Sequence, residues 1–122
     1  MTHPYFFIIK AEPTPAAFNA RDLEGAHVNV WIMETDIATA EVKARSHVLS
    51  YGWIPRKIRF AGEATDELIA SLDEIEQRNY EEAIQSGIAA AFYGWTKARH
   101  PAAFFEYRPL GPPLDAGKEK MH

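Results

Sequence analysis

Three tryptophans, Trp31, Trp53 and Trp95, fall on or beside segments whose pattern predicts β-strands. Aromatic rings with a few polar groups among them are the usual lining of a small-molecule pocket. If these strands are neighbours in one sheet, the rings could line a single pocket together with Tyr51 and the amide of Asn29. Packing in the core and burial in a dimer interface are the two alternative interpretations of the same residues.

Glu34 and His47 are the candidate acid–base residues at such a pocket. Glu34 stands at the end of a predicted strand, close to Asp36, and His47 lies on the margin of the sheet-facing side of the helix that follows. An imidazole titrates near neutral pH, which suits a general acid or base. The alternative roles are structural: Asp36 as a helix cap, and His47 as a histidine at the edge of the core with its hydrogen bonds satisfied.

The sequence carries no motif for a metal, a cofactor or a catalytic nucleophile. It has no cysteine, and its five histidines show no ligand spacing such as H-E-x-x-H. The seven glycines form neither a phosphate-binding loop nor a G-x-S-x-G nucleophile motif. We therefore expect no metal and no cofactor, and we favour a non-catalytic protein while leaving an enzyme open.

The charge distribution bears on the possible partners. Thirteen Lys and Arg against seventeen Asp and Glu give a net charge of -4, whereas a nucleic-acid-binding protein is expected to carry a basic excess. Nucleic acid is therefore an unlikely partner. Positive charge is nevertheless concentrated in residues 41–60, next to an acidic stretch in residues 61–85. Because Arg56, Lys57 and Arg59 lie near aromatic residues on one predicted strand, single-strand nucleic-acid binding remains the weaker alternative.

Hydrophobic periodicity predicts strands that alternate with helices along the chain. Val28, Val30 and Ile32 alternate with less apolar residues, so we expect them to form a core face. The expected strands are 5–9, 27–34, 54–61 and 88–95; the expected helices are 37–51, one that begins after Thr65 and one that ends at Gly87, with a break near Gln77–Asn79.

This order, β-β-α-β-α-α-β, predicts the α+β class. We expect a two-layer sandwich in which a four-stranded sheet carries its helices on one face, ferredoxin-like in kind. The length of 122 residues suits one domain, which we place at residues 1–97. Residues 98–122 form a C-terminal extension rich in proline and aromatic residues, and we expect it to pack on the same or a neighbouring subunit because a free tail rarely carries so much apolar surface.

These observations favour a self-associating module, most simply a homodimer, or a module that binds another partner. The alternative is a small enzyme or small-molecule-binding protein that uses the aromatic pocket with His47 and Glu34. The sequence shows no secretory leader and no apolar run near the roughly 20 residues of a membrane span. We therefore expect a soluble, cytoplasmic protein that does not contact a membrane.

Overall fold

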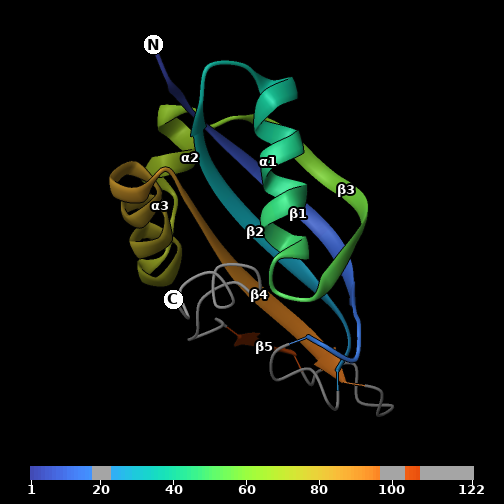
Figure 1. Cartoon of the computed structure of the whole chain (residues 1–122). Helices are drawn as coiled ribbons and strands as arrows, with labels where there is room; N and C mark the ends of the chain where they lie inside the picture. The colour runs from blue at the N-terminus through green and yellow to red at the C-terminus, as the bar shows by residue number, and fades with distance from the viewer. Residues whose placement is uncertain (18–22, 97–103, 108–122) are drawn as a thin grey trace, which may run out of the picture.

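The computed structural model describes residues 1–17 and 23–96 and the backbone of 104–107 (Figure 1). Its strands form a fully antiparallel sheet in the order β3-β1-β2-β4-β5. The strands are β1 (His3–Pro13), β2 (Leu23–Glu34), β3 (Trp53–Glu63), β4 (Ile88–Thr96) and β5 (Phe104–Tyr107), and the helices are α1 (Ile37–Leu49), α2 (Asp66–Ala70) and α3 (Glu74–Ser86). The predicted α+β class is confirmed, and so are the four predicted strands.

β1 lies in the interior of the sheet and is covered on both faces. Its aromatic and β-branched residues favour an extended backbone. Phe7 and Ile9 are fully buried on one face, while Phe6 is buried on the other and Ile8 is half-buried there. The strand ends at Pro13, where proline can no longer donate to the sheet. Burial on both faces is what the apolar run predicts.

α1 packs on the first face of the sheet, across β1, β2 and β3 (Figure 1). Val28, Val30 and Ile32 point toward it and are buried, as predicted. Asp36 caps the helix by accepting a hydrogen bond from the Thr39 backbone N–H at 2.8 Å. The sheet and α1 thus form one pair of packed layers.

The expectation that all the helices share one face is corrected by the structure. α2 and α3 pack on the opposite face, where Leu68 and Ala83 contact the cluster around Phe6, Trp31 and Ala89. The physical reason is that β1 and β2 carry apolar side chains on both faces, so the second face also needs a cover. The chain between β3 and β4 supplies that cover, and the ferredoxin-like resemblance is not confirmed.

The break between the last two helices falls earlier than predicted. α2 ends at Ala70, and α3 runs without interruption from Glu74 through Asn79. Asp73 begins α3, because its side chain accepts a hydrogen bond from the Glu76 backbone N–H at 2.8 Å. The predicted break near Gln77–Asn79 was wrong because Asp73, six residues before Asn79, caps the helix instead.

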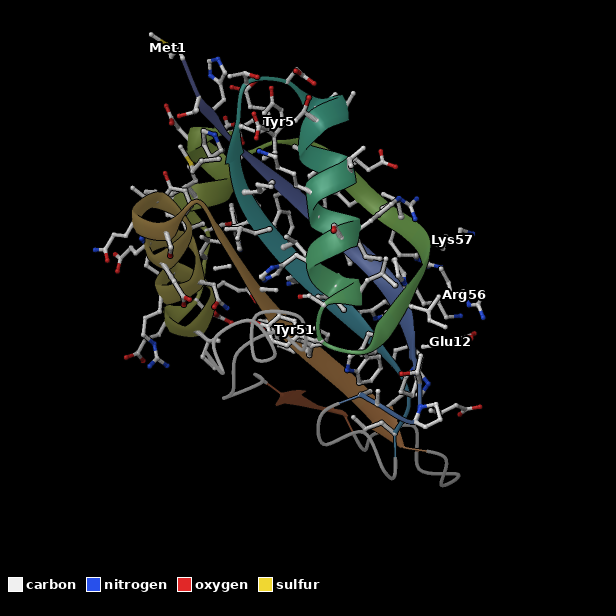
Figure 2. All side chains as sticks on the ribbon, viewed as in Figure 1. Met1, Tyr5, Glu12, Tyr51, Arg56 and Lys57 are labelled. Carbon is white, nitrogen blue, oxygen red and sulfur yellow. The ribbon has the colours of Figure 1, made fainter. Side chains whose placement is uncertain are left out.

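β3 forms an edge of the sheet, as its proline and cations predict. Figure 2 shows Glu12, Arg56 and Lys57 at this edge, where the Arg56 Nε donates to the Glu12 carboxylate at 3.0 Å. At the far side of the sheet, the short strand β5 pairs with β4. The rest of the 98–122 extension lies outside the described residues, so its docking and the homodimer remain predictions.

Within the described ranges, no helix is both long enough and apolar enough to cross a membrane.

Candidate functional site

The aromatic residues that could have lined one pocket lie on opposite faces of the sheet. Trp53 is fully buried in the core under α1, and Tyr51 packs on the same side, with its ring 5.7 Å from that of Phe92. Trp31 belongs to the opposite face, and the ring of Trp95 lies 5.2 Å from that of His27. The fold therefore does not bring the three tryptophans together.

Glu34 and His47 are also too far apart to act as an acid–base pair. Glu34 precedes α1 and accepts hydrogen bonds from Lys43 at 2.7 Å and from the Thr35 backbone at 2.9 Å, which lower the pKa of its carboxyl group. His47 lies near the other end of α1, edge-on to Tyr51. The ten residue steps along α1 from position 37 to position 47 span about 15 Å. Burial lowers the pKa of His47 against the opposing effect of Glu82.

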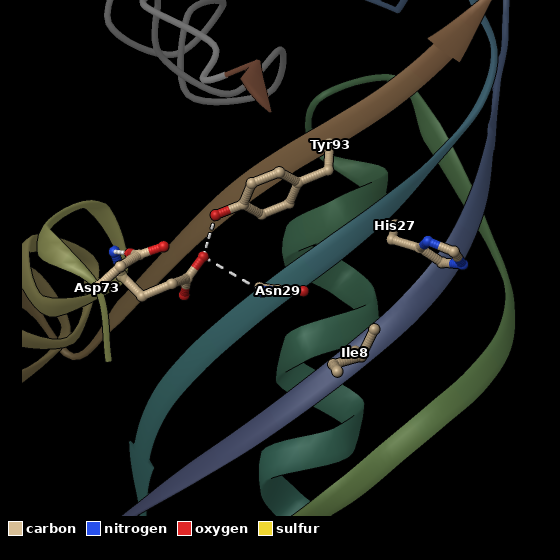
Figure 3. A pocket seen from close by; sticks show the side chains of 6 residues that line it. Ile8, His27, Asn29, Asp73 and Tyr93 are labelled. Carbon is tan, nitrogen blue, oxygen red and sulfur yellow. Dashed lines mark hydrogen bonds between the residues drawn. The ribbon is translucent and has the colours of Figure 1, made fainter. Parts of the chain in front are cut away.

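A different group of residues lines a pocket of about 370 Å³ on the face that carries α3 (Figure 3). Strands β1, β2 and β4 provide its floor and one wall, and the first turn of α3 provides the opposite wall. The lining residues are Ile8, His27, Asn29, Asp73, Glu76 and Tyr93. Of the candidate site residues predicted from the sequence, Asn29 lines this pocket, and Trp31 donates a hydrogen bond to Glu76 in the pocket wall.

The carboxylate of Glu76 is the centre of this site. Trp31 Nε1 donates to its Oε1 at 3.0 Å, and Asn29 Nδ2 donates to its Oε2 at 3.2 Å. The Tyr93 hydroxyl donates to the same Oε2 (Figure 3). Glu76 is only 8% exposed, and among the described residues no lysine, arginine or histidine forms an ion pair with it. The site thus holds a buried negative charge that neutral donors alone stabilise.

The hydrogen bonds to Glu76 also decide which atoms face the pocket. A carboxylate only accepts, so the Asn29 amide must turn its NH₂ toward Glu76 and its carbonyl oxygen away from it. One Asp73 oxygen is used by the Glu76 backbone N–H, which leaves the other oxygen as an acceptor. The Asn29 carbonyl oxygen and the second Asp73 oxygen are therefore acceptors that these hydrogen bonds leave unused.

His27 occupies the end of the pocket away from α3 (Figure 3). Burial lowers its pKa below the usual 6.5, and the positive charges of Arg59 and Lys10 lower it further. At neutral pH the imidazole is therefore uncharged, with one nitrogen as donor and the other as acceptor.

Sequence reasoning missed His27, Asp73 and Glu76 as site residues, and it included Tyr93 only among the aromatic rings near the tryptophans. Asp73 and Glu76 have the spacing of a helix-capping pair, and Glu76 counts as one more acid in an acidic stretch. In the structure its side chain reaches the sheet instead of the helix terminus. One signal was present: His27, Asn29 and Trp31 alternate with core residues, so their polar atoms share the other face of a buried strand.

The described part of the chain contains no group of three or more His, Cys, Asp or Glu side chains that could hold a metal ion. No protein-family model, curated protein or solved structure matches the chain.

Proposed function

We propose that this protein binds a small organic molecule through a cationic, N–H-rich group that lies against Glu76. The observation that carries the proposal is the buried carboxylate of Glu76, which has three neutral donors and, among the described residues, no cation that pairs with it. Burying an unpaired charge is unfavourable, because the lost hydration is only partly replaced by neutral hydrogen bonds. A ligand ammonium or guanidinium would supply the missing positive charge.

The shape and chemistry of the pocket support a small ligand. Its volume of about 370 Å³ lies at the lower end of the range for small-molecule sites, roughly 300–1,000 Å³. Its acceptors, the Asn29 carbonyl oxygen and the second Asp73 oxygen, match a group with several N–H donors. The three donors around Glu76 occupy three of the about four lone-pair sites of its carboxylate, which leaves an acceptor site for an N–H of the ligand.

Glu76→Gln tests this function, because it keeps the shape of the side chain and removes its charge. We expect wild-type protein to bind pentylamine, followed by calorimetry and by amide chemical shifts. The variant should bind it at least about tenfold more weakly, since a hydrogen bond to a charged group contributes about 1.5–3 kcal/mol. Glu74→Gln is the matched control, because Glu74 is an exposed acid in the same helical turn and does not line the pocket.

Two results would overturn the proposal: no binding of pentylamine to the wild type, or equal binding to wild type and Glu76→Gln. If Glu76→Gln fails to fold, as judged by circular dichroism, Asp73→Asn removes the second pocket carboxylate at an exposed position. That variant should weaken pentylamine binding by about threefold, and unchanged binding would count equally against the proposal.

A further inference from the structure

Three cations lie beside the His27 end of the pocket. Lys10 on β1 is the register partner of His27 on β2 and of Lys57 on β3. Paired residues of adjacent strands point to the same face of the sheet, so Lys10 and Lys57 project on the side of the pocket. Arg59 is close enough to act on the charge of His27. Among the described residues, none of these three cations forms an ion pair with an acid.

The acidic and basic groups therefore occupy opposite ends of one polar surface. At the acidic end, Asn29 on β2 donates to Glu76 and is the register partner of Ile8 on β1. Two positions along the same strands, His27 on β2 pairs with Lys10 on β1. Two residues along a strand span about 7 Å. A molecule that contacts both Glu76 and Lys10 must consequently separate its own charged groups by about this distance or more.

We propose that the ligand of this pocket is an extended zwitterion, with its ammonium at Glu76 and Asp73 and its carboxylate or similar anion at Lys10 and Arg59. This inference rests on the proposed function, since it adds an anionic end to the cationic group bound by Glu76. A simple amine would leave the three cations unpaired. The α-ammonium and α-carboxylate of an amino acid are too close together to reach both ends, because both lie on one carbon.

Four probes of matched carbon number test the charge and the spacing by calorimetry at low salt: 5-aminopentanoate, pentylamine, 2-aminopentanoate and pentanoate. We expect 5-aminopentanoate to bind best, at least about threefold tighter than pentylamine, because each solvent-exposed ion pair adds a modest increment. We expect 2-aminopentanoate to bind no more tightly than pentylamine, and pentanoate to bind most weakly of the four.

Lys10→Gln should abolish the advantage of 5-aminopentanoate over pentylamine, because it removes the cation that faces the carboxylate of the probe. Arg59→Gln should reduce the same advantage and serves as the second variant if Lys10→Gln does not fold. Lys43→Gln is the control, because Lys43 pairs with Glu34 beside α1 and away from the pocket; it should alter neither affinity.

The outcomes separate the two proposals. If pentylamine binds through Glu76 and 5-aminopentanoate binds no tighter, the zwitterion inference is overturned and the proposed function stands. Equal binding of 2- and 5-aminopentanoate overturns the inferred spacing and, with it, the extended ligand. If none of the four probes binds, or if pentanoate binds best, both proposals fail.

Discussion

The two faces of this sheet are built from the same strands and have different chemistry. The face under α1 is closed by aliphatic and aromatic side chains, with Phe7, Val30 and Val48 fully buried. The face under α3 is only partly apolar, because it buries Glu76 and Asn79 as well. An apolar face gains stability from close packing, whereas buried polar groups must each find a hydrogen-bond partner.

This difference separates the structural face from the candidate binding face. On the α3 face, Trp31 gives its indole N–H to Glu76, and the side-chain amide of Asn79 is buried with no hydrogen-bond partner among the described residues. Polar groups buried without full compensation reduce stability, and such groups gather at functional sites. The face under α1 is therefore the more completely apolar of the two, and the proposed binding pocket lies on the face under α3.

The largest expected effect on stability comes from replacing one phenylalanine by alanine on each face and comparing the two losses. Phe7→Ala should reduce the free energy of unfolding by about 3–5 kcal/mol, because Phe7 is fully buried in the core under α1. Phe60→Ala, on the face of α3, should cost about 1 kcal/mol or less, because Phe60 is 44% exposed and contacts mainly the ring of Phe6. Urea unfolding monitored by fluorescence measures both, and similar losses would contradict the assignment of the faces.

A smaller effect should distinguish the two fully buried tryptophans. Trp31→Phe removes both ring volume and the N–H that donates to Glu76, whereas the Trp53 N–H has no hydrogen-bond partner in the described residues. Trp31→Phe should therefore reduce the free energy of unfolding by about 1.5–3 kcal/mol more than Trp53→Phe does, because Trp53→Phe loses ring volume alone. The same unfolding experiment compares the two variants. Equal losses would mean that the bond to Glu76 contributes no net stability.

The smallest expected effect is the pH dependence that two histidines, one on each face, give to the free energy of unfolding. The pKa of His27 and that of His47 are both lowered, chiefly by burial, from the usual 6.5. The unfolded chain then binds more protons than the native state just below pH 6.5. Stability should therefore be highest above pH 6.5 and decrease as the pH falls through the native pKa values.

Proton NMR titration of the imidazole signals checks both histidines, and His47→Gln and His27→Gln should each flatten part of the stability profile below pH 6.5. A native pKa at or above 6.5 for either residue would refute the corresponding half of this prediction. A short histidine peptide titrated under the same conditions is the unshifted standard.

Much of the fold follows from local patterns along the chain. The alternation of Val28, Val30 and Ile32 predicts a core face, and Asp36 and Thr65 cap helices where the sequence places them. Such features depend on neighbours a few residues away, so the sequence states them directly. The positions of the helices on the sheet do not follow in this way, because a strand that is apolar on both faces accepts a helix on either one.

The candidate site was harder to predict because its members come from four separate elements. Asn29 and Trp31 were singled out from the sequence, but their partner Glu76 lies 45 residues or more along the chain from each of them. The sequence by itself determined β1 to β4, the caps of α1 and α2, and the apolar face that holds α1. Only the tertiary structure decided that α3 turns a cap-like glutamate toward the sheet, because buried donors and a buried carboxylate must find one another in space.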